Sequence, residues 1–304
     1  EGGWRIKGIR HEVENLREAF IDTCLSGISN VTFEDCEWKI AETDKRTSHE
    51  NIGLIGINQG VIENVSFKDI TIRSGLGNYT GCVAYNLGEI QDVTLTDIKV
   101  YGNIYTGGLS GYSLNPVKRI TAKGTLKYEG EHDYSSSYEV QGTNQVGGII
   151  GHGILTDSIQ VSGIKVTGTG NGVRHIGGAV GYGQFIMPEE TNGASMRKAS
   201  LVADTFVTVP PEEASGSQPT SIGGVMGAGY NHQYFIFQEN TEVYAPTAIY
   251  AGGITGSGYL NYCGARSVDA GEKGYTLKKA SVTAGSYAGG VQMAEPSLQR
   301  KIWR

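Results

Sequence analysis

Four residues that could do acid–base chemistry share one short polar stretch: Glu129, Glu131, His132 and Asp133. Glycoside hydrolysis needs two carboxyl groups roughly 5 to 9.5 Å apart, and this run could supply an acid and a base. Such a run is more often a solvated loop. We therefore favour a non-catalytic interpretation and keep the four residues as the catalytic candidates of an enzymatic alternative.

Tyrosine is the second chemical signal, with 17 residues, many of them in stretches that interrupt the repeat described below. Exposed rings beside carboxylates and amides suit sugar faces or protein partners. The alternative is that the rings pack long loops back onto the body of the protein. The candidate ligand-binding residues are Tyr128, Tyr134, Tyr138, Tyr230, His232 and Tyr234.

Acidic and amide residues recur at two fixed positions. Asn30, Asn64 and Asp92 share the first position, and Asp35, Asp69 and Asp97 share the second, five residues later. Glycine takes the second position in later copies, and Asp and Gly both adopt left-handed turn conformations, so we favour turn formation. Calcium ligation by Asp35, Asp69 and Asp97 is the alternative. The nonapeptide calcium signature of β-rolls is absent, and we expect no cofactor.

The four cysteines, Cys24, Cys36, Cys82 and Cys263, have no metal-ligand spacing. Small buried hydrophobes are the favoured interpretation, and a Cys24–Cys36 disulfide stays open. The sequence contains no His-Glu-x-x-His motif, nucleophile elbow or phosphate-binding loop.

A glycine-rich motif repeated along the chain must position all of these residues. Its clearest copies are residues 145–153, 175–183, 221–229 and 250–258, with looser copies at 52–56, 80–84 and 106–111 and a truncated one at 287–291. We take the second glycine, or its equivalent, as a marker at Gly53, Cys82, Gly108, Gly148, Gly178, Gly224, Gly253 and Gly290. The tight intervals are 26 to 30 residues and the others carry insertions, which indicates a solenoid.

Between the glycines, apolar and polar residues alternate at period two, as in residues 62–72, 89–100 and 158–166, which is typical of half-buried strands. The pattern predicts an all-β fold: a single-stranded right-handed parallel β-helix (solenoid) with loop insertions, its coils about 4.8 Å apart. A propeller blade needs about 40 to 50 residues, more than the tight repeats provide.

Three regions follow from this pattern. Residues 1–50 form an N-terminal cap and first coil, 51–126 regular coils, and 127–304 coils with long insertions and a truncated end. Over residues 13–25 we favour strand over an amphipathic helix, because Phe20-Ile21 overlays Leu54-Ile55. Residues 1–18 should cap the exposed strand edges.

The composition and charge of the chain limit the classes of partner that we expect. The net charge is −6 and no basic stripe appears, which argues against nucleic acid. No run of about 18 apolar residues is present, so membrane insertion is not expected. The chain begins at Glu1, and we expect it to be a piece of a longer polypeptide whose other domains are its partners.

The glycine copies resemble the GLUG motif of bacterial secreted and cell-surface proteins. The copies that carry the resemblance are residues 53–56, 108–111, 148–151, 178–181, 224–227 and 253–256, with Asn58–Val65 and Asn86–Val93 resembling the usual continuation. The resemblance implies a β-helical stalk, as in adhesins and in non-catalytic regions of immunoglobulin-A proteases, and it transfers no catalytic residues.

The expected function is a non-enzymatic scaffold or adhesion segment of a bacterial surface or secreted protein. It would bind a glycan or a host surface protein through the insertions at 127–145 and 230–250. One alternative is a carbohydrate-active enzyme, either a polysaccharide lyase or a glycosidase. The other is the accessory region of a large secreted protease.

Overall fold

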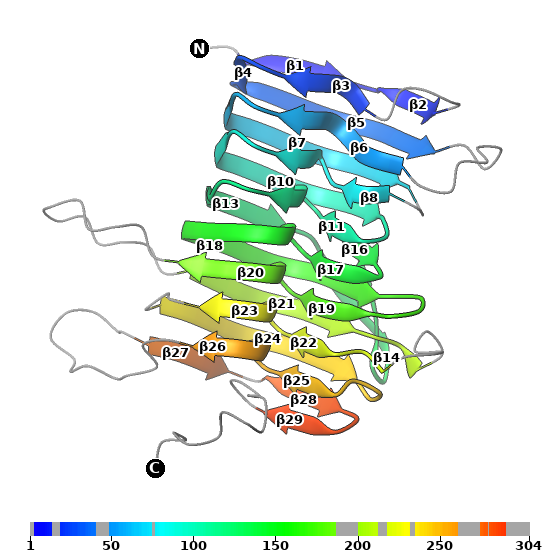
Figure 1. Cartoon of the computed structure of the whole chain (residues 1–304), viewed down its shortest axis with the longest axis vertical. Helices are drawn as coiled ribbons and strands as arrows, with labels where there is room; N and C mark the ends of the chain where they lie inside the picture. The colour runs from blue at the N-terminus through cyan, green and yellow to red at the C-terminus, as the bar shows by residue number, and fades with distance from the viewer. Residues whose placement is uncertain are drawn as a thin grey trace, which may run out of the picture.

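The computed structural model describes residues 3–13, 19–40, 49–74, 77–186, 200–211, 218–231, 235–260, 274–278 and 280–289. Within these residues the protein is all-β, with strands and no α-helix. Accordingly, none of these segments forms a helix of the length and apolar character that crossing a membrane requires. The strands stack in layers along one axis, from the N-terminal end at the top of Figure 1 to the C-terminal end at the bottom.

The strands group into successive layers. The first are β1 (Trp4–Lys7) and β2 (Arg10–Val13), then β3 (Ala19–Cys24), β4 (Gly27–Ser29) and β5 (Val31–Ile40), then β6 (His49–Asn58) and β7 (Val61–Arg73), then β8 (Gly77–Thr80), β9 (Val83–Asn86) and β10 (Glu89–Tyr101). The middle layers hold β11 (Tyr105–Gly107), β12 (Ser110–Ser113), β13 (Val117–Lys123), β14 (Leu126–Gly130), β15 (Asp133–Ser136) and β16 (Tyr138–Gly142), then β17 (Asn144–Gly147) and β18 (Ile150–Gly168). The last are β19 (Arg174–Gly177), β20 (Val180–Ile186) and β21 (Ser200–Thr208), then β22 (Ser221–Gly223), β23 (Met226–Asn231) and β24 (Phe235–Ala245), then β25 (Tyr250–Gly252), β26 (Thr255–Leu260), β27 (Gly274–Lys278), β28 (Ser281–Ala284) and β29 (Tyr287–Gly289).

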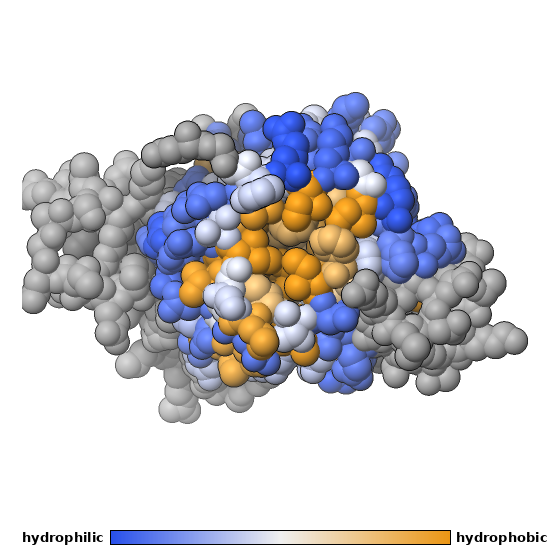
Figure 2. Space-filling model, turned by 90° about the horizontal axis from the view of Figure 1, so that it is seen from above, coloured by the Kyte–Doolittle hydropathy of each residue, from blue (hydrophilic) through white to orange (hydrophobic). Residues whose placement is uncertain are grey.

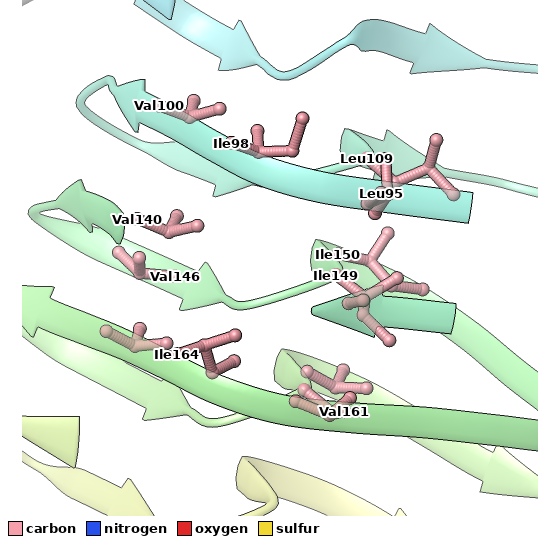
Figure 3. Packing of buried hydrophobic residues seen from close by; sticks show 14 of the residues in the cluster. Leu95, Ile98, Val100, Leu109, Val140, Val146, Ile149, Ile150, Val161 and Ile164 are labelled. Carbon is pink, nitrogen blue, oxygen red and sulfur yellow. The ribbon is translucent and has the colours of Figure 1, made fainter. Parts of the chain in front are cut away.

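Strands of one layer pair in parallel with the equivalent strands of the next. The longest such ladder joins β7 to β10, from Val61 opposite Glu89 to Arg73 opposite Tyr101. Because the register is the same between successive layers, similar side chains stand above one another. Phe33, for example, stacks on Phe67 with ring centroids 5.2 Å apart. The apolar columns merge into one core that runs through the stack, part of which Figure 3 shows.

The predicted overlay of the first repeat is confirmed. Ile21 pairs with Ile55, Gly27 with Val61, and Cys36 with Ile70. Residues 19–24 form strand β3, so the helical alternative is wrong there. The strand forms because residues 19–24 pair in parallel with β6, from Ala19 opposite Gly53 to Cys24 opposite Asn58.

The N-terminal residues cover a strand edge rather than the whole end of the stack. Both β1 and β2 pair in parallel with β5, Trp4 opposite Val31 and Val13 opposite Ile40. Figure 2 looks onto this end and shows hydrophobic residues at its centre, ringed by hydrophilic ones. In place of the expected cap, residues 3–13 therefore form one further layer of strands, which covers only the edge of β5.

The two predicted insertions contain fewer residues outside the stacked strands than expected. Of residues 127–145, β14 and β15 form an antiparallel hairpin, whereas β16 returns to the wall between β10 and β18. Of residues 230–250, β24 is a wall strand that pairs with β21. The many aromatic and polar residues in these stretches masked their alternation at period two.

The motif corner contains one more residue in later layers than in early ones. Thr80 pairs with Thr106 and Val83 with Ser110, so Gly81-Cys82 stands opposite Gly107-Gly108-Leu109. The second glycine is the added residue. The predicted equivalence of Cys82 and Gly108 is therefore wrong, because the buried Cys82 takes the inward place of Leu109.

The third motif glycine is needed because β20 crosses the backbone of the preceding layer there. A Cβ on Gly181 would lie 2.5 Å from the Val146 nitrogen and 2.6 Å from the Gly151 oxygen. Gly227 and Gly256 meet the backbone of their preceding layers in the same way. The spacing of the repeat thus follows from backbone contact between layers.

Replacing Gly181 with alanine should lower the free energy of unfolding by about 3 kcal/mol, because the neighbouring backbone cannot move aside. Gly130→Ala is the matched control: its nearest atom would be Asp133 Cβ at 3.9 Å, and we expect a change within about 0.5 kcal/mol. Urea unfolding followed by circular dichroism measures both. Equal stability of the two variants would contradict the close contact at the corner.

Candidate functional site

The catalytic candidates lie on the β14–β15 hairpin, which projects from the wall. The side chains of Glu129, Glu131 and Asp133 are all solvent-exposed, that of Glu131 to 90%. Ser135 Oγ donates a hydrogen bond to Glu129 Oε1 at 2.6 Å. The hairpin therefore does not gather the three carboxylates into an enclosed site.

His132 instead turns toward the wall and meets a residue that the sequence did not single out. Its Nδ1 lies 2.5 Å from Glu242 Oε1, and its ring stacks on Tyr244 at 4.0 Å between centroids. Tyr134 donates its hydroxyl to Glu242 Oε2 at 3.0 Å and packs against Phe206. Burial, followed by the bond to Glu242, raises the pKa of Tyr134 to about 12. These contacts fasten the hairpin to β21 and β24.

The predicted ligand-binding residues separate into three groups. Tyr128 and Tyr230 are exposed to 66% and 43% and are accessible to a ligand. Tyr138 is fully buried and donates its hydroxyl to Gly148 O at 2.7 Å, so the prediction that it binds a ligand is wrong. His232 and Tyr234 lie outside the described residues. Tyr138 was misassigned because its strand was taken for a loop.

The two recurring polar positions have the left-handed backbone conformation on which the turn prediction rested, but apart from Asn30 they lie within strands β5, β7 and β10. Asp35, Asp69 and Asp97 have φ of 56°, 51° and 55°, and Asn30, Asn64 and Asp92 repeat these values. Later layers place Gly163, Asp204 and Asn240 at the second position, also with positive φ. Glycine, Asp and Asn are the residues that tolerate this conformation.

The acidic side chains of the second position have protein partners. Asp35 Oδ1 lies 2.5 Å from Arg10, Asp69 Oδ2 lies 3.8 Å from Lys68, and Asp97 accepts a hydrogen bond from Ser137. In the described ranges, no group of three or more His, Cys, Asp or Glu residues could hold a metal ion. Calcium ligation therefore stays an untested alternative.

The described cysteines are buried free thiols: Cys24, Cys36 and Cys82. The optional Cys24–Cys36 disulfide is not formed, and Cys263 lies outside the described residues. Burial raises the pKa of the Cys36 and Cys82 thiols, which suits their role as small apolar side chains.

Seven rings form a continuous outer band, which we call the aromatic row. Its members are Tyr79, Tyr85, Tyr105, Tyr112, His152, His175 and Tyr182. Tyr79 stacks on Tyr105 at 5.2 Å, and Tyr112 stacks on His152 at 4.6 Å. Tyr79 and Tyr105 form one column, and Tyr85, Tyr112 and His152 form a second. Tyr105 meets Tyr112 edge to face at 5.5 Å, which joins the two columns. The row thus spans four layers of the stack.

The glycine motif builds this row. Each copy places one side chain before its first glycine and one after its third, as Tyr105 and Tyr112 bracket residues 107–111. Register then aligns Tyr112 with Tyr85 on one side and His152 on the other. No site was predicted here, because the predicted ligand-binding tyrosines lie between the motifs. The rings at the two fixed motif positions were the available signal.

The row is electrically neutral at physiological pH. Burial, with smaller contributions from Arg174 and His152, lowers the pKa of His175 to about 4, and burial also lowers the pKa of His152. Burial and neighbouring tyrosines raise the pKa of Tyr79 and Tyr112. The surface therefore offers phenol and imidazole groups without charge.

Changing the turn residue Asp69 separates turn formation from calcium binding. We expect Asp69→Gly to alter the free energy of unfolding little, whereas Asp69→Val should cost about 1–2 kcal/mol because valine resists positive φ. Added calcium should leave the thermal midpoint of the parent unchanged. A calcium-dependent rise in that midpoint that Asp69→Gly abolishes would favour ligation.

His175 should make the fold acid-sensitive. Its folded pKa of about 4 lies below the usual 6.5, so the unfolded chain takes up the proton first. The contribution of the neutral His175 to the free energy of unfolding is fully present above pH about 6.5. It is lost as the pH falls toward 4, which lowers the free energy of unfolding by about 3 kcal/mol. Urea unfolding at pH 7 and pH 4 should show that His175→Gln loses less stability than the parent. Identical losses would contradict the burial of a neutral imidazole.

Comparison of the chain with protein-family models, with curated proteins and with solved structures finds no match in any of the three. The resemblance to the GLUG motif therefore stays a prediction from the sequence.

Proposed function

We propose that the chain is a non-enzymatic scaffold, built as a single-stranded right-handed parallel β-helix and belonging to a bacterial surface or secreted protein. The observation that supports this most is the parallel register between layers from β3 to β29, the β14–β15 hairpin excepted, around one continuous core. The right-handed sense follows from the usual handedness of parallel crossovers. Such a stack can hold other domains of a longer chain at a distance.

The polar clusters on the wall support a structural role. Arg119 donates to both carboxylate oxygens of Asp92 at 2.7 Å and lies 3.3 Å from Asp157. Glu242 is engaged by His132 and Tyr134 together. These groups connect strands of different layers, so their bonds stabilise the stack. The accessory region of a secreted protease remains a variant of the same proposal, in which the chemistry lies elsewhere in the parent chain.

A second candidate function rests on one observation at the hairpin. Glu242 lies at Nδ1 of His132, and Glu131 Oε1 lies 3.9 Å from Nε2 on the other side of the ring. Two carboxylates that share one imidazole could move a proton between them. A polysaccharide lyase or glycosidase acting at the hairpin is therefore the alternative. We favour the scaffold because Glu131 is almost fully exposed.

An activity screen on acidic and neutral polysaccharides distinguishes the two functions. We expect no release of reducing ends and no unsaturated product from the parent chain. Turnover that Glu131→Ala and Glu242→Gln both abolish, and that the exposed control Glu89→Ala retains, would overturn the scaffold proposal. A thermal melt of each variant separates lost chemistry from lost folding.

A further inference from the structure

Four hydroxyl groups of the aromatic row have no hydrogen-bond partner within the described part of the chain. Among the residues that the structure describes, the hydroxyls of Tyr79, Tyr85, Tyr105 and Tyr112 form no hydrogen bond. The same four oxygens are not among the buried, unpaired polar atoms, so they reach solvent. The rings are half-buried by their stacking. The row therefore presents phenol edges outward while its faces pack internally.

This arrangement is preorganised for binding. Each ring is held by neighbours on two sides: Tyr105, for example, stacks on Tyr79 and meets Tyr112 edge to face. A ligand would not have to immobilise these side chains, which removes a conformational-entropy cost of roughly 0.5–1.5 kcal/mol for each. Tyrosine hydroxyls both donate and accept hydrogen bonds, so they suit a ligand rich in hydroxyl groups.

The geometry of the row favours a linear ligand. Its two columns run along the axis of the stack, and equivalent hydroxyls recur at the layer spacing of about 4.8 Å. That spacing is comparable to the length of one sugar ring in an extended polysaccharide. A polymer lying along the axis would therefore meet phenol edges in two successive layers, first Tyr79 and Tyr85 and then Tyr105 and Tyr112, and the imidazole of His152 in the next layer.

The electrostatics favour a neutral ligand. Among the described residues, Glu50 raises the pKa of Tyr79 and Arg174 lowers the pKa of His175, so one acid and one base act on these two rings. The two histidines are neutral at pH 7 because burial lowers their pKa values. A protein partner would instead gain most from a patch of apolar side chains, and here the ring faces are already used in stacking.

We propose that the aromatic row binds a linear neutral polysaccharide that lies along the axis of the stack. This site goes beyond the scaffold role and does not use the hairpin tyrosines. Its recognition groups are the phenol hydroxyls, with His152 and Tyr182 continuing the surface toward later layers.

Affinity electrophoresis in gels containing hydroxyethyl cellulose, glucomannan or linear β-1,3-glucan tests the site. The triple variant Tyr79→Phe/Tyr105→Phe/Tyr112→Phe keeps every ring and removes three hydroxyls. We expect it to weaken retardation at least about tenfold relative to the parent. Tyr101→Phe removes a hydroxyl that lies outside the row and donates to Glu139, and it should bind like the parent. Tyr128→Phe tests the hairpin separately. Unchanged thermal midpoints confirm that the variants are folded.

Three results would overturn the proposal: no retardation of the folded parent by any of the three neutral polysaccharides, equal retardation of parent and triple variant, or stronger retardation by alginate than by the neutral polymers. Loss of retardation in Tyr128→Phe instead of the triple variant would place the site on the hairpin and also contradict it. None of these results bears on the scaffold proposal, which the turnover screen tests separately.

Discussion

Parallel backbone pairing between successive layers is the interaction on which the rest of this structure depends. Each strand satisfies its N–H and C=O groups with the equivalent strand one repeat away, so a residue's neighbours are the residues at the same motif position. A residue type that recurs at one motif position therefore forms a column of like side chains through the layers. The cost of this arrangement falls at the corners, where backbones of adjacent layers touch and a side chain at Gly181 would collide with residues 145 and 146.

The same constraint explains why the early and late layers differ. Asn58 Nδ2 donates to Asn86 Oδ1 at 2.8 Å, and Asn86 Nδ2 donates to Ser113 Oγ at 2.8 Å, which gives a buried amide ladder. The next layers place Gly153 and Gly183 in this column, with φ of 152° and 151°. The Asn-x-Gly turn of the early copies thus gives way to a glycine column, because the backbone follows a path that side chains rarely adopt.

Outward-facing columns are where function can accumulate in such a stack. Inward columns are restricted to side chains that fill the core, whereas outward ones tolerate any residue that does not disturb the corner. The aromatic row and the hairpin use this freedom differently. The row gains rigidity from stacking along the axis, and the hairpin gains it from Glu242, which receives His132 and Tyr134 from 110 and 108 residues away.

The sequence alone determined the all-β class, the repeat, the strand overlay of the first layer and the left-handed backbone at the two polar positions, because periodicity and positive-φ preferences are local. Only the tertiary structure decided that Tyr138 is core, that the insertion at 127–145 is a short hairpin, and that Glu242 meets His132. It also decided that rings flanking the glycines form one band. These outcomes depend on register between layers, and local patterns do not specify which outward side chains that register brings together.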